Sequence, residues 1–584
     1  MKKDYLLGLF ILVGLILSQF YGYSQIPATT KEQLFKDWNY SPTGVFGLVK
    51  MNDPKNQEYY KIFKPSNESV KIQEFNEAGI QLNTTLIRFI NGKLSQITVT
   101  NQWGNTYEIS KFTPSGLDEF LVTKKNTGEN VYLPCKGAKF IYKNNLLTEV
   151  RYISYANKLA ANSNGVSIIK YKRYTDKDRF SLTKEMAFYD ASGKPVISTS
   201  NDCHKVTYEY DERGNQTSVA YFGINNEPLA DRFGGFKNKY QYDENNKMIL
   251  SETIGINDEI TRNAYGVARV KYEYKDGFLS KSTRFDERDN ITKASDAGDG
   301  VAIIRYEYDK NGNEILRSFF DENDKPMKNH SGYHKIFYRY DSLNKHIATA
   351  YYDEYASPAN DRKGIHEYKY VRDDKGRTTQ ESYYSNNNTP MQDDLHEVYM
   401  IKYKYDDQGR NISESYWENS ATKMNRWSGS HESIKKYNDA GLLIENILLD
   451  QAGRQFVSKS GFSRVTTNYN AEAKVSGYKY FSGEKPANLE NGFANGFHFI
   501  KFYYDLKGRL ASLRYFDTSG QPVDAFIDMD NGFYCHQVEF IYKGNTIVEE
   551  KLYLKSATAP SRVIDCLKNN YIGTSGIRMG YKNR

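Results

Sequence analysis

Histidine is the first residue type to test for chemistry, because an imidazole can act as a general base or bind a metal ion at neutral pH. No histidine of this chain falls in an H-E-x-x-H or other metal-ligand spacing. The His-Glu pairs at His366, His396 and His431 occupy, in our interpretation, different places in the surrounding sequence. We therefore expect no metal site and no cofactor at the nine histidines, which are His204, His330, His334, His346, His366, His396, His431, His498 and His536.

Carboxylates are numerous, with 72 Asp and Glu, and could supply catalysis or bind calcium. The segment DMDNG from Asp528 resembles half of a calcium-binding loop, but it lacks the spacing and the closing glutamate. A pair of acids like that of glycosidases stays open, because the sequence alone does not show which acids face each other. There is no G-x-S-x-G elbow, P-loop or dinucleotide fingerprint. We predict no catalytic residue.

Aromatic residues dominate the composition, with 50 Tyr and 31 Phe. A tyrosine can bury its ring while its hydroxyl stays in water, so these rings can build much of the interior. Trp38, Trp103, Trp417 and Trp427 could stack on sugars, although packing within a sheet is the interpretation that we favour. The net charge is +7 with both signs interspersed, so no basic stripe indicates nucleic acid.

The four cysteines are Cys135, Cys203, Cys535 and Cys566. They contain no C-x-x-C, and their even number permits disulfides in an exported chain. We favour a disulfide between Cys535 and Cys566, the more local pair, with buried thiols as the alternative.

The N-terminus reads as an export signal. Lys2 and Lys3 precede an apolar stretch from Leu6 to Leu17 that is too short for a comfortable membrane span. Gly22 and Ser24 are small residues at the −3 and −1 positions of a cut before Gln25. We predict a signal peptide over 1–24 and a periplasmic or cell-surface protein, with an uncleaved anchor as the alternative.

An aromatic-x-aromatic phrase recurs with a period near 32 residues in about thirteen copies, which indicates a repeat array rather than separate domains. The run around each phrase alternates between apolar and polar residues, as strands do. The clear copies begin at Phe140, Tyr208, Tyr240, Tyr272, Tyr306, Tyr338, Tyr368, Tyr403, Phe502 and Phe540, and the degenerate ones at Tyr171, Lys435 and Thr467.

A tight turn follows each phrase. An Asp can accept backbone N–H groups at its first position, and a Gly three residues later tolerates a left-handed backbone. Asn replaces this Gly at Asn246 and Asn344. The structural turn residues that we predict are Asp211 with Gly214, Asp309 with Gly312, Asp406 with Gly409, and Asp505 with Gly508.

A second strand follows and ends in a pair of rings, and a longer second turn then carries a late proline, as at Pro228 and Pro326. Each unit is therefore strand, tight turn, strand, longer turn. The predicted fold is all-β, an antiparallel meander of about thirteen two-stranded repeats. Because open twisted sheets rarely exceed about ten strands, we expect this one to curl into a solenoid or a shell-like sheet. The predicted parts are the signal peptide 1–24, an N-terminal β-rich region 25–135, the array 136–545 and a C-terminal tail 546–584.

The units YEYDERGN, YEYDKNGN, YKYDDQGR and FYYDLKGR resemble the YD repeats of the RHS family over about residues 136–545. The resemblance implies strands of a long sheet wound into a hollow shell. The unit here is longer than the usual YD repeat, and the family's core segment and toxin domain are missing from the sequence. A plain extracellular YD-repeat protein is the closer likeness.

Two functions are compatible with these observations. We favour a non-enzymatic scaffold that binds other cell-envelope or surface proteins, with its contacts in the variable second turns. The alternative is a glycan-binding or glycan-active module that uses aromatic residues. We expect no nucleic-acid partner, and no transmembrane segment in the mature chain.

Overall fold

A computed structural model describes residues 33–565, apart from 41–44, 52, 67, 117, 127–128, 133–134, 145, 176–181, 232, 296–297, 394–396, 419–420, 423–428, 471–473, 491–493, 506–508, 528–532 and 544–545. The signal peptide predicted over 1–24 lies outside this range. The chain divides into two compact units, Met1–Met391 (unit 1) and Gln392–Arg584 (unit 2), so a boundary falls within the predicted array. Within the described range, no helix is long and apolar enough to cross a membrane.

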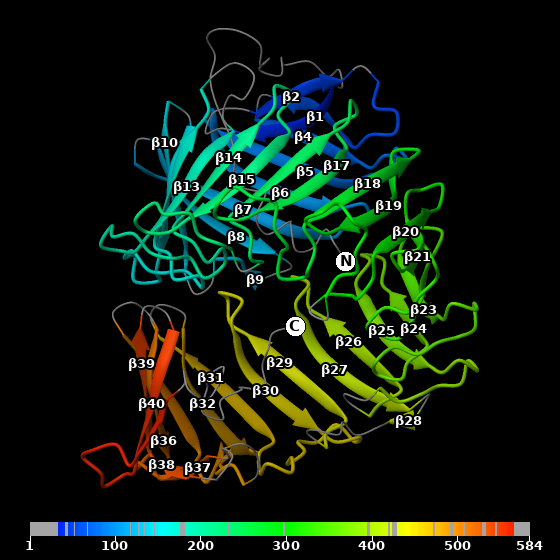
Figure 1. The fold of residues 1–584 in the computed structure, drawn as a ribbon. Helices are drawn as coiled ribbons and strands as arrows, with labels where there is room; N and C mark the ends of the chain where they lie inside the picture. The colour runs from blue at the N-terminus through cyan, green and yellow to red at the C-terminus, as the bar shows by residue number, and fades with distance from the viewer. Residues whose placement is uncertain are drawn as a thin grey trace. The chain divides into compact units, whose positions relative to one another are not determined.

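Unit 1 is built from strands that pair with their neighbours in an antiparallel meander (Figure 1). Its N-terminal region contains β1 (Gln33–Tyr40), β2 (Val45–Met51), β3 (Tyr59–Ser66), β4 (Ser69–Phe75), β5 (Gln81–Ile90), β6 (Lys93–Asn101), β7 (Thr106–Gly116), β8 (Glu119–Asn126) and β9 (Glu129–Asn130). Strand β1 pairs with both β2 and β3, and β3 to β8 then follow in order. Strand β8 pairs with β10 and so joins this region to the repeats.

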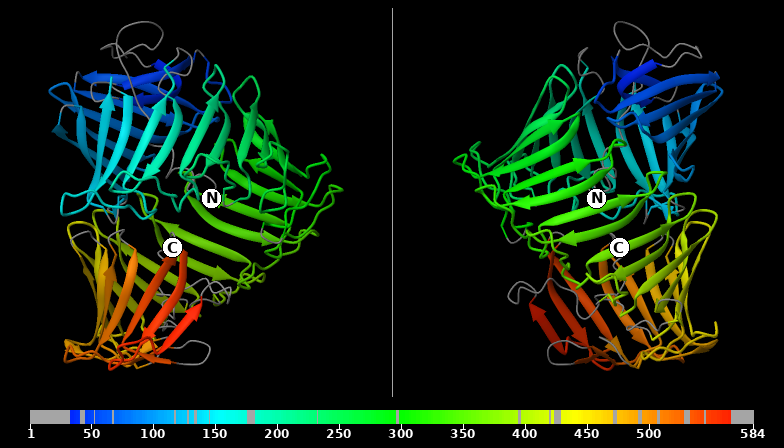
Figure 2. Two further views of the ribbon diagram at one scale, coloured as in Figure 1. Left: turned by 60° about the vertical axis from the view of Figure 1, so that its left-hand side comes forward. Right: turned by 90° about the vertical axis from the view of Figure 1, so that its right-hand side faces the viewer.

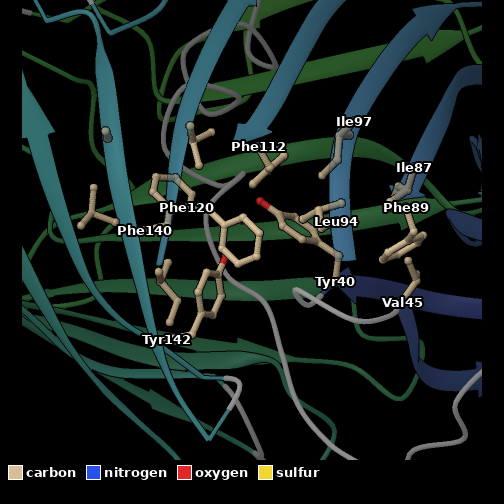
Figure 3. Close-up of a cluster of buried hydrophobic side chains, with 14 of the residues drawn as sticks. Tyr40, Val45, Ile87, Phe89, Leu94, Ile97, Phe112, Phe120, Phe140 and Tyr142 are labelled. Carbon is tan, nitrogen blue, oxygen red and sulfur yellow. The ribbon is translucent and has the colours of Figure 1, made fainter. Parts of the chain in front are cut away.

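The N-terminal region holds the largest apolar cluster of unit 1, which Figure 3 shows. The rings of Phe112 and Phe140 meet edge to face at 6.3 Å, and Phe120 meets Tyr142 in the same way at 6.1 Å. Such edge-to-face contacts add about 0.5–1.5 kcal/mol to the burial of the rings. This cluster gives the region beside the repeats an apolar interior of its own.

The repeats of unit 1 are hairpins. Each first strand has six or seven residues and pairs along its whole length with the second, whereas the second strand pairs over only three residues with the next hairpin. The strands are β10 (Gly137–Lys143), β11 (Leu146–Ile153), β12 (Ile168–Arg173), β13 (Thr183–Tyr189), β14 (Lys205–Tyr210), β15 (Gln216–Phe222), β16 (Lys237–Tyr242), β17 (Met248–Ile254), β18 (Arg269–Lys275), β19 (Phe278–Phe285), β20 (Ile303–Tyr308), β21 (Glu314–Phe320), β22 (Lys335–Tyr340), β23 (His346–Tyr352), β24 (Glu367–Arg372) and β25 (Thr378–Tyr384).

Unit 2 is built from hairpins of the same kind, and Figure 2 shows its strands side by side. They are β26 (Met400–Tyr405), β27 (Asn411–Glu418), β28 (Ala421–Thr422), β29 (Glu432–Tyr437), β30 (Leu443–Leu449), β31 (Arg464–Tyr469), β32 (Val475–Ser482), β33 (Lys485–Pro486), β35 (Phe499–Tyr504), β36 (Leu510–Phe516), β39 (Gln537–Lys543), β40 (Thr546–Tyr553) and β41 (Arg562–Asp565). A separate small sheet contains β34 (Ala494–Asn495), β37 (Ala525–Ile527) and β38 (Phe533–Cys535).

The end of the array differs from the predicted boundary at residue 545. Strand β40 is the second strand of a hairpin with β39, and β41 pairs with β40. Leu552 in β40 is fully buried in the apolar cluster of unit 2. The segment 546–565, which we assigned to a tail, is therefore part of the sheet. Its strands β40 and β41 carry no aromatic-x-aromatic phrase, which is why the sequence pattern ends before them.

The all-β antiparallel meander expected from the sequence is confirmed in each unit. The sequence pattern did not predict a shift of register within the hairpins. In most of the hairpins the register shifts by one residue just before the terminal tyrosine of the first strand, as between Glu209 and Tyr210. Such a β-bulge bends the strand and disturbs the ladder locally.

The terminal tyrosine links successive repeats. The hydroxyl of Tyr242 donates to the backbone carbonyl of Gln216, the first residue of the second strand in the preceding repeat, at 2.8 Å. Burial raises the pKa of Tyr242 to about 12, so the hydroxyl remains a donor. The same bond recurs from Tyr274, Tyr437, Tyr469, Tyr504 and Tyr542.

Arginine replaces this tyrosine in two repeats and keeps the bond. Nε of Arg173 donates to the carbonyl of Leu147 at 3.0 Å, and Nε of Arg372 donates to that of His346 at 2.9 Å. Both guanidinium groups also donate to a threonine hydroxyl, of Thr183 and Thr378 respectively. The repeat therefore requires a donor at this place, and the phenol is one way to supply it.

Candidate binding surface

The predicted tight turns are five-residue loops closed by their first residue. Asp211 Oδ1 accepts the backbone N–H groups of Arg213 at 2.9 Å and Asn215 at 2.8 Å. Asp309 and Asp406 accept the equivalent pairs of N–H groups in their own loops. Asp505 accepts the N–H of Arg509 at 2.9 Å. These acids are therefore occupied in holding the backbone.

The fourth residue of the loop has a left-handed backbone. The φ angle is +75° at Gly214, +77° at Gly312 and +82° at Gly409. The asparagines that stand in for glycine, Asn246 and Asn344, have φ of +61° and +58°. Gly508 lies outside the described residues.

The same loop occurs up to three times in one repeat, and sequence reasoning recognised only the first. The second copy follows the second strand, as at Asp321, whose Oδ1 accepts the N–H groups of Asn323 and Lys325. The third copy precedes the next first strand, as at Asp361, which accepts from Lys363 and Ile365. The late proline pairs with the last ring residue of the second strand, as Pro326 does with Phe320.

Two second turns place the carboxylate at the other end of the loop. Gly223 stands where Asp is usual, and Glu227 Oε2 accepts the N–H of Asn225 at 2.8 Å. A Cβ on Gly223 would lie 2.0 Å from Glu227 Oε1, and one on Gly255 would lie 2.2 Å from Glu259 Oε1. The absence of a side chain on the glycine leaves space for the glutamate carboxylate, which at Glu227 accepts a backbone N–H as the aspartate does in other turns.

The first turns form a row along one end of the strands, which we name the first-turn row: residues 211–215, 243–247, 275–278, 309–313, 341–345 and 373–377. Neighbouring turns bond directly, as Asn215 Nδ2 does to Asn246 Oδ1 at 2.9 Å. The N-terminal region reaches this row. Trp103 Nε1 donates to the carbonyl of Leu343 at 2.7 Å, and Asn76 Nδ2 to that of Asn311 at 2.8 Å.

Charged side chains make further contacts between the N-terminal region and the first-turn row. Lys36 Nζ donates to Asn215 Oδ1 at 2.6 Å, and Glu77 pairs with Lys247 at 2.8 Å. The side chains of Glu77 and Lys247 are 16% and 15% exposed. Residues of the N-terminal region therefore cover parts of the first-turn row of unit 1.

The second and third turns form the opposite row, which we name the paired-turn row: residues 190–204, 223–236, 255–268, 286–302, 321–334 and 353–366. Neighbouring third turns also bond directly, because the N–H of Ala264 donates to the carbonyl of Phe233 at 2.6 Å and that of Ser295 to Tyr265 at 2.7 Å. The row is therefore a continuous surface built from stacked loops.

Large apolar side chains are exposed along this row, among them Tyr355 at 82% and Ile291 at 39%, and two consecutive repeats expose them in matching positions. Ile224 is 47% and Ile256 is 57% exposed at the same position of two second turns. Phe233 and Tyr265, each 39% exposed, lie at the same position of two third turns with their ring centroids 5.9 Å apart. We name these four residues the apolar patch. Exposed apolar groups that recur on neighbouring repeats are typical of interaction sites.

The histidines have a structural arrangement that corrects one interpretation. His366 and His431 occupy the same place, directly before a first strand, rather than different places. Each ring meets the last ring of the preceding second strand edge to face, at 5.2 Å for His366 and 5.1 Å for His431. His204, His334, His498 and His536 stand in the equivalent position, while His396 lies outside the described residues. Spacing to the following phrase would have revealed this pattern, because His204, His334, His431, His498 and His536 each stand four residues before the start of a copy.

The tryptophans that the structure describes serve packing and bonding. The ring of Trp103 lies against Gly376 of the first-turn row. Trp417 lies under the ammonium group of Lys402, 3.9 Å from the ring centroid, and beside His431. Trp38 packs against the N-terminal cluster. Trp427 lies outside the described residues.

Cys535 is fully buried, and burial raises the pKa of its thiol to about 12. Cys566 lies outside the described residues, so the disulfide between the two stays a prediction. The DMDNG segment from Asp528 also lies outside them. Across the part of the chain that the structure describes, no three His, Cys, Asp or Glu side chains gather in a way that could hold a metal ion.

The strands of unit 1 present a charged face beside the paired-turn row. A shallow depression there is lined by Leu250, Glu252, Arg269, Lys271 and residues 287–289. Arg269 bonds Glu252 at 2.9 Å and Asp289 at 3.4 Å, and Arg262 holds Glu287 at 2.5 Å. The carboxylates of Glu252, Glu287 and Asp289 are therefore held in ion pairs, and we interpret the depression as a structural feature of the sheet.

No family model and no curated protein matches this sequence. Among solved structures, a TcdB2-TccC3 crystal structure without the hypervariable C-terminal region matches with a TM-score of 0.28 and 10% identity, over 88% of this chain and 32% of that one. A Photorhabdus luminescens Tc holotoxin pore matches with a TM-score of 0.26, 10% identity and the same coverage. A porin-like protein from Bacteroides uniformis matches with a TM-score of 0.13 and 7% identity, over 49% of this chain and 87% of that one. The chain spans about a third of the length of the first two.

Proposed function

We propose that this protein is a non-enzymatic, exported repeat scaffold that binds another cell-envelope or cell-surface protein along the paired-turn row of unit 1. We further propose that its meander curls into a solenoid or shell-like sheet, as in the YD-repeat proteins that its sequence resembles. The observation that carries the binding proposal is the apolar patch, which exposes four large side chains on consecutive turns.

Three features support a surface rather than a pocket. The loop acids are occupied in holding backbone N–H groups, so they contribute shape rather than reactive groups. The paired-turn row is continuous from repeat to repeat. The first-turn row is covered by the N-terminal region, which leaves the paired-turn row as the exposed loop edge of unit 1.

Capture from the cell envelope tests this function. A tagged mature chain would be compared with a variant in which Ile224, Phe233, Ile256 and Tyr265 are replaced by serine. The expected result is one or more proteins retained by the parent and reduced at least tenfold by the variant. The matched control replaces Ile249, Phe337 and Val371 by serine, since these residues are also exposed but lie on strands. Equal retention by the parent and the patch variant would reject the proposal.

Glycan binding is the second candidate, and the exposed ring pair of Phe233 and Tyr265 favours it. Aromatic faces can stack on sugars. Treatment of the captured material with proteases and with glycosidases separates the two candidates. Retention that survives proteases and is lost with glycosidases would favour the glycan.

A further inference from the structure

The charge of unit 1 is distributed unevenly between strands and turns. Counted on the sequence, the six segments of the paired-turn row contain 17 Asp and Glu against 9 Lys and Arg, a net charge of −8. The ten strands from β14 to β23 contain 5 Asp and Glu against 12 Lys and Arg, a net charge of +7. The row that carries the apolar patch is therefore acidic within a chain whose net charge is +7.

Acidic side chains lie directly around the apolar patch. Glu227 and Glu259 are exposed and end the two second turns that carry Ile224 and Ile256. Asp258 directly precedes Glu259 in the same turn. Its side chain is 69% exposed and lies 3.9 Å from the ammonium group of Lys237. The strand cations beside the row are held by local partners: Arg269 pairs with Glu252, and Lys205 stacks on Phe222 at 4.4 Å.

We infer that the paired-turn row of unit 1 recognises a protein segment that combines apolar side chains with lysines and arginines. The apolar patch supplies the contact area, and the acids around it select a partner of opposite charge. The inference rests on the proposed scaffold function and adds the chemistry of its partner. An acidic or neutral apolar partner would meet like charge or no complementary charge along the row.

The test uses the full mature chain and two labelled synthetic peptides of 16 residues. One contains leucine and lysine in equal numbers, and the other contains leucine and glutamate in the same order. At low salt the lysine peptide should bind at least tenfold more tightly than the glutamate peptide. Its affinity should fall several-fold between 50 and 300 mM NaCl, because salt screens exposed charges. Equal binding of both peptides would overturn the inference.

A matched pair of variants locates the effect. Glu227→Gln, Asp258→Asn and Glu259→Gln together remove three charges from the row and keep the side-chain oxygens that the turns use. This triple variant should bind the lysine peptide about tenfold less tightly. The control, Glu209→Gln, Glu273→Gln and Glu307→Gln, removes three exposed charges from strands and should change the affinity less than twofold. An equal loss in both variants would mean that the attraction is diffuse, and the inference would be wrong.

Failure here is distinguishable from failure of the scaffold function. If the patch variant loses captured protein while the two peptides bind alike, the scaffold stands and its partner is not cationic. If the patch variant retains every captured protein, the scaffold itself fails, whatever the peptides show.

Discussion

The two turn rows of unit 1 are built from one loop and have different surroundings. In most turns of both rows an Asp or Asn closes five residues, and the fourth residue has a positive φ. The exceptions are the shorter turn 275–278 of the first-turn row and the turns that begin at Gly223 and Gly255 in the paired-turn row. The first-turn row lies against Trp103, Asn76 and Lys36 of the N-terminal region, whereas the paired-turn row exposes its apolar and acidic side chains. The loop sequence therefore specifies a backbone shape, and the neighbours of each copy decide whether it serves the interior or the surface.

The largest expected difference between the rows comes from a methyl group at the left-handed position. Gly376 has φ of +78°, and a Cβ there would lie 2.0 Å from the ring of Trp103. Gly193 in the paired-turn row has φ of +81° and nothing within 4 Å of a Cβ. Gly376→Ala should lower the free energy of unfolding by about 3 kcal/mol, and Gly193→Ala by about 1 kcal/mol. Urea denaturation of the full chain measures both; equal losses would show that Trp103 does not constrain the first-turn row.

The buried tyrosine hydroxyls should matter more than the exposed one. Tyr242→Phe removes the bond to the carbonyl of Gln216 and should cost about 1 kcal/mol. Tyr265→Phe changes a partly exposed ring of the paired-turn row and should stay within about 0.5 kcal/mol of the parent. Thermal unfolding of the two variants side by side provides the measurement. A larger loss for Tyr265→Phe would reverse the assignment of interior and surface.

Mild acid should destabilise the first-turn side of unit 1. His346, at the start of β23, has a pKa lowered to about 4, first by burial and then by the charge of Arg372. Its pKa is lower in the folded chain than in the unfolded chain, so the unfolded state binds more protons between about pH 6.5 and 4. Stability should fall as the pH falls through that window, by less than about 1 kcal/mol between pH 7 and 5.5. His346→Gln should reduce this dependence, and an unchanged pH profile would contradict it.

The smallest expected effect tests the carboxylate exchange in the paired-turn row. Glu227→Ala removes the acceptor for the N–H of Asn225 in an exposed turn and should cost about 0.5 kcal/mol. Adding Gly223→Asp to this variant should restore the stability, since Asp at that position closes the equivalent turn at Asp321. Gly223→Asp alone should destabilise the turn, because its side chain would meet the carboxylate of Glu227. Melting temperatures of the three variants give the comparison.

Much of the repeat could be predicted because its signals are local. Alternation around Tyr208 and Tyr306 indicates strands, and Asp211 with Gly214 indicates a tight turn. The second and third copies of the loop were missed because their first residue varies: Gly223 and Ser458 stand where Asp stands elsewhere. The glycine before many of the first strands, such as Gly234 with φ of +87°, is the fourth residue of the same loop.

The contacts between the N-terminal region and the first-turn row could not be predicted from the sequence. Trp103 and Leu343 are 240 residues apart, and Asn76 and Asn311 are 235 apart. Neither Trp103 nor Asn76 carries a pattern that names a distant partner, because such contacts depend on how the sheet brings its ends together. The exposure of Ile224 and Phe233 was equally hidden, since apolar residues beside turns are commonly buried.

The tyrosine link between repeats has a consequence for how such a chain can change its length. Every linked repeat carries its donor near the end of its first strand and offers its acceptor at the start of its second. A tandem duplication or deletion in the gene that spans one whole repeat leaves each donor facing an acceptor. The turns between them can also differ in length, since donor and acceptor are 26 residues apart at Tyr242, 29 at Tyr504 and 32 at Tyr542. Gain or loss of a whole repeat therefore keeps every link intact, and a change in the length of the turns is absorbed without breaking one.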